Sequence, residues 1–286
     1  MLDNSNPLLL RTGNPNLVQD YRHTMVMRYS SAKPEKSTNF FGLVSGEVVQ
    51  NYIANNTLTD SATIAGIVNQ SGGGIDILDG AQLSLPVNVD GYYRIRSFAT
   101  YGLPLSFIKS NLNLNGSATF THAPGLTNNR EIIANTQSYG LGAVLSSNIS
   151  ENLDFTLSAN PTYNLVQYTP KTRSDNNYFN LNSGLRLNWI IWKGLFVQSD
   201  ITHQYYSGLS AGIEQNYLLW NAAIGKKLFK NNQGEIKLTA FDILKQNNSI
   251  QRNVTENYVE DIETDVLQQY FMLVFTYNIR AFGPGK

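Results

Sequence analysis

The chain lacks cysteine and carries few charged residues. None of its 286 residues is Cys, which fits an envelope protein that avoids oxidative mispairing, although many other proteins also lack Cys. Charged residues make up 15% of the chain, against roughly 25% in ordinary soluble domains. The formal net charge is +0, from 21 Lys and Arg against 21 Asp and Glu, so no bulk electrostatic attraction to nucleic acid is expected.

Long apolar runs and targeting signals are also missing. No apolar stretch approaches the roughly 20 residues of a transmembrane helix, and the stretch from Trp189 to Val197 is broken by Lys193 and Gly194. No helical pattern stands out. The N-terminus has no basic region followed by an apolar core, so no secretion signal is visible and we expect a mature form or a fragment.

The sequence is instead rich in aromatic residues and alternates with period two. It holds 16 Tyr and 13 Phe. From Asn111 to Thr121 every second residue is apolar or small, and the residues between them are Asn, Ser or Thr. A helix would scatter such apolar groups around its axis, whereas a strand gathers them on one face. Gly140 and Gly142, which lie within such a pattern, indicate packing or curvature rather than a nucleotide motif.

The alternation predicts about eleven strands, each at least as long as a transmembrane strand of about 9–11 residues. They are expected near 20–31, 37–53, 91–102, 107–121, 136–148, 152–166, 177–192, 195–206, 215–229, 235–245 and 268–282.

The connections between these strands alternate in length. The short ones are 32–36, 103–105, 149–151, 193–194 and 231–234, and the long ones are 54–90, 122–135, 167–176, 207–214 and 246–267. Short turns on one side and long loops on the other are typical of outer-membrane barrels, whose short turns are periplasmic. The fold class predicted is therefore all-β, an antiparallel up-and-down meander of a transmembrane β-barrel in the outer membrane of a Gram-negative bacterium, with residues 1–286 as one barrel domain.

An odd strand count has a topological consequence. The first and last strands would both run towards the periplasm, and two such strands cannot close an antiparallel barrel against each other. We therefore expect a partial barrel, about half of a large one of about 22 strands, the size of plugged transporters.

The final strand carries the most apolar face. Phe271, Leu273, Phe275 and Tyr277 point to one side, and Phe282 lies where an aromatic girdle would meet the interface. With this strand, several short motifs in order make the chain similar to the C-terminal barrel portion of TonB-dependent receptor-like outer-membrane proteins. These motifs are Asn6-Pro7-Leu8, Gly13-Asn14-Pro15-Asn16-Leu17, Pro86-Val87-Asn88-Val89-Asp90-Gly91, Leu219-Trp220-Asn221, Phe241-Asp242-Ile243-Leu244 and Tyr258-Val259-Glu260-Asp261.

The resemblance implies a receptor or transporter that binds or passes a ligand through a polar lumen and extracellular loops. It also implies that the five aromatic and apolar residues of the last strand are read by the barrel-assembly machinery. The expected partners are thus outer-membrane lipid, that machinery and an unknown ligand. Such receptors carry a plug and an energy-coupling segment ahead of the barrel. Neither is visible here, so an energy-coupling partner is expected only if a plug exists.

Few residues suggest chemistry. Arg94, Arg96, Asp154, Arg186 and Asp200 fall on polar faces and are candidates to line a lumen, where we favour stabilising ion pairs because interior charges must be paired or hydrated. His23, His122 and His203 lack the spacing of a metal site. The acidic segment with Glu256, Glu260, Asp261, Glu263 and Asp265 suits a solvated loop better than a cation site, and the glycines at 72–74 suit a surface loop. We expect no cofactor, no metal and no enzymatic activity.

Two alternatives stay open. An outer-membrane hydrolase with its site at the loop rim would need a His beside a long loop, which only His122 provides. A soluble all-β binding protein or adhesin would turn the apolar faces inward instead of towards lipid.

Overall fold

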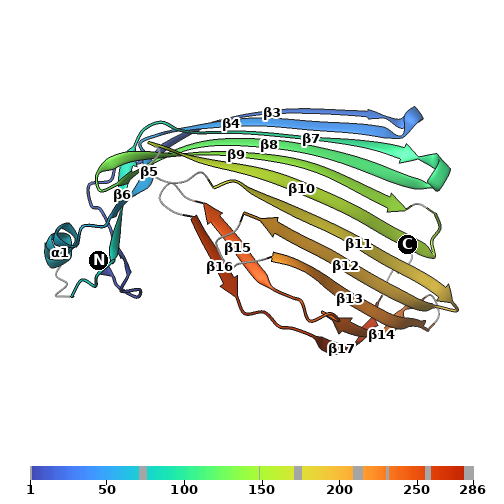
Figure 1. The fold of residues 1–286 in the computed structure, drawn as a ribbon. Helices are drawn as coiled ribbons and strands as arrows, with labels where there is room; N and C mark the ends of the chain where they lie inside the picture. Colours follow the sequence, from blue (N-terminus) through green and yellow to red (C-terminus); the bar gives the residue numbers. More distant parts are fainter. Residues whose placement is uncertain are drawn as a thin grey trace, which may run out of the picture.

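The computed structural model describes residues 2–70, 76–147, 149–170, 176–208, 215–229, 232–254 and 259–279. Its main feature is one long, curved sheet of antiparallel neighbours (Figure 1). Eleven strands run side by side in chain order: β3 (Tyr21–Lys33), β4 (Thr38–Gln50), β7 (Tyr92–Leu105), β8 (Ser110–Thr127), β9 (Arg130–Ser147), β10 (Leu153–Thr169), β11 (Tyr178–Trp192), β12 (Leu195–Ser207), β13 (Gln215–Leu228), β14 (Gly234–Phe241) and β17 (Tyr270–Tyr277). The predicted antiparallel meander is confirmed. Among the described residues no helix is long and apolar enough to cross a membrane.

The sheet is open. Among the described strands, β3 pairs only with β4, and β17 pairs only with β14. Ten successive antiparallel pairings link these two edge strands, so both run in the same direction. The two edges therefore cannot close against each other in an antiparallel barrel.

Each strand has an apolar face and a polar face because its side chains alternate. The apolar face is not a covered core. Leu157 is 50% exposed and Phe275 is 59% exposed, and Leu112 and Leu187 are only partly buried. These four residues therefore do not meet in a central core, as a soluble all-β protein with inward apolar faces would require.

Glycines reveal which face is the more crowded. On the polar face, a Cβ added at Gly142 would lie 2.6 Å from Asn160 Oδ1, and one at Gly140 would lie 2.5 Å from Ser117 Oγ. On the apolar face, a Cβ at Gly46 or Gly116 would meet nothing within 4 Å. Side chains converge on the inner side of a curved sheet and diverge on the outer side, so these glycines indicate that the polar face is the inner one.

A small lobe occupies one end of the sheet (Figure 1). It contains β1 (Leu2–Asp3), β2 (Leu9–Thr12), β5 (Tyr52–Leu58), helix α1 (Ser61–Gln70) and β6 (Gln82–Val89). Its core consists of Leu10, Leu58, Ile64, Val68 and Leu83. The lobe joins the main sheet where β5 pairs in parallel with the end of β8.

This lobe corrects two predictions. The single strand expected over 37–53 is divided at Asn51, whose φ of 52° lies in the left-handed region, into β4 and β5. The segment 54–90 is not a plain loop, since it holds most of β5, α1 and β6. Helix α1 escaped the sequence analysis because it is 10 residues long and buries only Ile64 and Val68, one turn apart.

Two other predicted long loops are also ordered as hairpins. Strands β8 and β9 continue through most of 122–135 to a two-residue turn at Asn128 and Asn129, whose φ values of 49° and 60° suit a tight hairpin turn. The connection 246–267 contains the hairpin β15 (Ser249–Val254) and β16 (Val259–Thr264). Short connections on the opposite side are confirmed at η1 (Pro34–Lys36) and at residues 193–194. The connection predicted at 103–105 is displaced, because β7 continues to Leu105 and the turn is formed by η2 (Ser106–Ile108).

Candidate functional site

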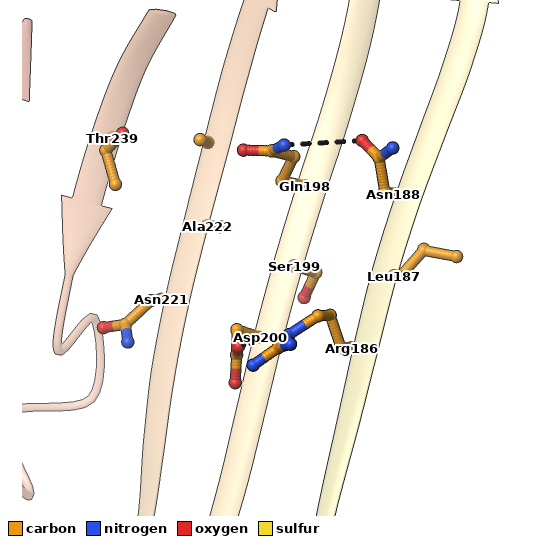
Figure 2. A pocket seen from close by; sticks show the side chains of 10 residues that line it. Arg186, Leu187, Asn188, Gln198, Ser199, Asp200, Asn221, Ala222 and Thr239 are labelled. Atoms are coloured by element: carbon orange, nitrogen blue, oxygen red, sulfur yellow. Dashed lines mark hydrogen bonds and ion pairs between the residues drawn. The ribbon is translucent and has the colours of Figure 1, made fainter. Parts of the chain in front are cut away.

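A polar pocket lies on the inner face of the sheet, across β11 to β14 (Figure 2). Its volume is about 230 Å³. Register places the side chains together, because Arg186 pairs with Asp200 and Asn188 pairs with Gln198 on neighbouring strands. The polar residues of this pocket are Arg186, Asn188, Gln198, Ser199, Asp200, Asn221 and Thr239.

The pocket carries hydrogen-bonding groups but no net charge. Arg186 Nε donates to Asp200 Oδ2 at 3.0 Å, and Gln198 Nε2 donates to Asn188 Oδ1 at 3.4 Å. Arg186 and Asp200 are 76% and 40% exposed, and exposed ion pairs contribute only about 0–1 kcal/mol. A ligand can therefore displace this ion pair at small cost, and the amides and hydroxyls supply both donors and acceptors.

Of the other predicted lumen charges, Arg94 and Arg96 lie on β7, away from this pocket, whereas Asp154 pairs with the pocket residue Asn188. Arg94 Nη2 contacts Glu47 Oε2 at 2.6 Å, and Arg22 Nη1 reaches the same carboxylate at 3.4 Å. Arg96 lies two residues further along β7, opposite Ser45. Asp154, at the start of β10, accepts a hydrogen bond from Ser147 Oγ at 3.2 Å.

Glu47 has no distinguishing pattern around it in the sequence. Its place opposite Arg94 follows from the alternation of β4 and β7, but pairing these two strands requires the order in the sheet. The structure thus brings Arg186 and Asp200 together and places Asp154 opposite the pocket residue Asn188, whereas Arg94 and Arg96 lie together on β7.

The four described aromatic and apolar residues of the last strand share the outer face. Phe271, Leu273, Phe275 and Tyr277 are between 51% and 70% exposed. Leu273 pairs with Leu238 and Phe275 with Ile236, which extends the apolar face onto β14. Phe282 lies outside the described residues.

The comparisons with known proteins agree with this arrangement. The sequence matches the model of the outer membrane protein beta-barrel family over residues 1–277. The chain belongs to this family. No curated protein and no solved structure gives a significant match. Membership assigns this outer membrane β-barrel protein to the outer membrane of Gram-negative bacteria, so its apolar outer face contacts lipid.

The β15–β16 hairpin of this family member contains a buried ion pair between Arg252 and Asp261 that was not expected from the sequence. Arg252 donates through Nε and Nη2 to both carboxylate oxygens of Asp261, at 2.7 and 2.6 Å. The two side chains are 2% and 1% exposed. Arg252 Nη1 also donates to Gly208 O at 2.6 Å and Asn176 Oδ1 at 3.2 Å, and its guanidinium lies 5.2 Å from the Tyr178 ring centroid.

The hairpin thereby covers the ends of β11 and β12. Tyr178, on the inner face, packs against a cluster of Ile132, Ala134, Val166 and Tyr168. Asp261 was predicted to lie in a solvated acidic loop, which is wrong because it is buried against Arg252. Glu256, in the same predicted loop, and Gly72–Gly74 lie outside the described residues.

The histidines of the barrel protein make local contacts. His122 Nδ1 lies 2.8 Å from Asn135 Oδ1, and its ring stacks on Tyr93 with 4.9 Å between centroids. His203 Nε2 lies 2.9 Å from Asn216 Oδ1. In the described part of the chain, no three His, Asp or Glu side chains gather as a metal ion would require.

Proposed function

We propose that this chain forms one side of a receptor or transport barrel, in which a polar ligand is bound or passed along the inner face without covalent chemistry. The pocket around Arg186 and Asp200 is the observation that carries the proposal. It combines donors and acceptors with a weak ion pair on the face turned away from lipid.

The likeness of the motifs to TonB-dependent receptors supports the same proposal. In that case the final strand, with Phe271 and Phe275 on its lipid face, serves the barrel-assembly machinery. An energy-coupling partner is expected to bind only if a plug domain accompanies the barrel.

Cysteine labelling tests the orientation, because the native chain has no Cys and each introduced thiol is the only one. In lipid vesicles, Asn188→Cys should react with a charged, water-soluble maleimide, whereas its neighbour Leu187→Cys should not. Asn221→Cys and Ala222→Cys form a second matched pair, on β13. Equal labelling of both members of each pair would contradict a wet inner face.

Ligand protection tests the function. Neutral oligosaccharides, short peptides and small anions are each added before the maleimide, and the labelling rate of Asn188→Cys is compared with that of a thiol outside the pocket, Asn39→Cys on β4. We expect one class of solute to slow only the first reaction. If none does so up to millimolar concentration, the pocket is not a ligand site.

A further inference from the structure

The apolar outer face is hollowed at one place. A depression of about 880 Å³ lies across β3, β4, β7, β8 and β9. Its floor is formed by small residues. Gly42, Ala99 and Gly116 lie in one register row, and Ala118 lies two residues further along β8, opposite Ser97. Its walls include Met27, Tyr29, Phe40 and Val44 on one side and Tyr139 and Leu141 on the other. We call this depression the apolar bowl.

Two polar side chains of the bowl are hydrogen-bonded within the protein, and the polar residues Arg28 and Ser117 occupy strand positions of the opposite face. Ser97 Oγ donates to Ala118 O at 3.3 Å, and Tyr139 Oη donates to Gln137 Oε1 at 2.9 Å. The rings of Tyr29 and Phe40 pack against each other in a tilted arrangement with 6.0 Å between their centroids. A molecule in the bowl would therefore contact mainly apolar atoms, which suits a hydrocarbon chain better than a polar ligand.

The depth of the bowl in the membrane follows from strand geometry. Ala99 precedes Leu105, the last residue of β7, by six positions. Six residues span about 20 Å along a strand, and a tilt of about 40° reduces this to about 15 Å along the membrane normal. That is half of a hydrocarbon core of about 30 Å, so the bowl lies near the midplane, where acyl chains end.

The short turns below the bowl are cationic. Lys33 and Lys36 flank the β3–β4 turn, and Lys109 ends the β7–β8 turn. Three Lys against the single acid Glu35 give these two turns a charge of +2. Phe107, 84% exposed beside Lys109, suits the interface between lipid headgroups and hydrocarbon.

We propose that the apolar bowl holds the acyl chain of a phospholipid whose phosphate lies at the lysines of these two turns. The bowl belongs to the lipid-contacting surface that family membership assigns to the outer face. Bulk lipid chains are as apolar as the bowl, so binding derives from close van der Waals contact over the small-residue floor and from the phosphate–lysine attraction. This lipid site does not depend on the proposed ligand pocket, which lies on the opposite face.

The test uses the full chain purified in detergent micelles and titrated with dioleoyl phosphatidylglycerol, with bound lipid counted by native mass spectrometry. We expect one retained phospholipid. Gly116→Leu places a side chain over the floor, where a Cβ meets nothing within 4 Å, and should lower lipid retention about fivefold or more by removing contacts of the chain. Gly46→Leu is the matched control: Gly46 shares the apolar face and the same open space but does not line the bowl, so retention should be unchanged.

Two further variants keep the test decisive. Ala99→Leu fills the same floor from β7 and replaces Gly116→Leu if that variant does not fold, with folding judged by heat-dependent mobility in detergent gels. Changing Lys33, Lys36 and Lys109 together to Gln should abolish the preference for phosphatidylglycerol over phosphatidylcholine. Equal lipid retention by the wild type and both filled variants, or no retained lipid in any of them, would overturn the proposal. So would a dimer that only the filled variants lose, because a second copy would then occupy the bowl.

Discussion

Arg252 and Asp261 face each other across the β15–β16 hairpin and form a two-bond ion pair that is almost fully shielded from water. The pair connects the hairpin to β11 and β12, since the same guanidinium donates to Asn176 and Gly208. A charge buried in this way is stable only while its partner remains, because an unpaired buried charge carries the full cost of desolvation.

Removing one partner of this pair should open the hairpin. Arg252→Ala leaves the Asp261 carboxylate without its main cation, and breaking a buried pair typically costs about 3–5 kcal/mol. Hydrogen exchange of the β15 and β16 amides should therefore accelerate by two orders of magnitude or more. The control is Arg186→Ala, which breaks the exposed pair with Asp200 and should leave hairpin exchange unchanged. Unchanged hydrogen exchange in Arg252→Ala would mean that the Arg252–Asp261 ion pair does not stabilise the hairpin.

The small lobe should unfold independently of the main sheet when its core is weakened. Leu83 is fully buried against Ile64 and Val68, and replacing a buried Leu by Ala costs about 2–5 kcal/mol. Leu83→Ala should make residues 52–89 susceptible to proteases while the strands of the main sheet stay protected. Leu78→Ala removes the same atoms from a residue that is 46% exposed, so its digestion pattern should match that of the wild type.

Helix α1 should weaken in acid. Hydrogen bonds from the Thr63 hydroxyl and backbone N–H hold the pKa of Asp60 below the usual range. Because the pKa is lower in the folded lobe than in the unfolded chain, the carboxylate stabilises the helix above about pH 4, and this is lost as pH falls through the folded value. Amide exchange in 61–70 should thus rise, relative to the lobe strands, between pH 5 and pH 2. Asp60→Asn keeps a capping side chain without a charge and should remove this dependence on pH.

Strand positions were predictable from the sequence wherever apolar and polar residues alternate along the chain. The residues of β8 and β11 each divide into an apolar and a polar set, and register then brings Arg186 to Asp200. The features that were missed depend on tertiary contacts. Arg252 and Asp261 lie on two short strands without an apolar pattern, so their burial follows from the contacts of Arg252 with Asn176, Tyr178 and Gly208. Glu47 is likewise one charged residue in a strand until β4 and β7 are known to be neighbours.

Curvature makes a glycine on the inner face sensitive to substitution. A Cβ at Gly225 would collide with the Phe196 ring and lie 2.7 Å from Lys237 Cβ and 2.8 Å from Ile236 O. Gly225→Ala should lower the free energy of unfolding by about 1–3 kcal/mol, as overpacking does. Gly116→Ala, on the outer face with open space, should change it by less than about 1 kcal/mol. Urea titration in detergent micelles compares the two, and equal losses would contradict the assignment of the faces.

The last strand offers the sharpest test of which face contacts lipid. Leu273 lies on the outer face of β17, and the adjacent Met272 lies on the inner face opposite Thr239. An Arg on the lipid face near the midplane costs about 2–4 kcal/mol, whereas an Arg on the inner face stays in water. Leu273→Arg should therefore lose that much folding free energy in phospholipid vesicles, measured by urea titration, and Met272→Arg should lose less than about 1 kcal/mol. If Met272→Arg proved the more costly substitution, the two faces would have to be exchanged, and both the lipid contact and the polar pocket would lose their basis.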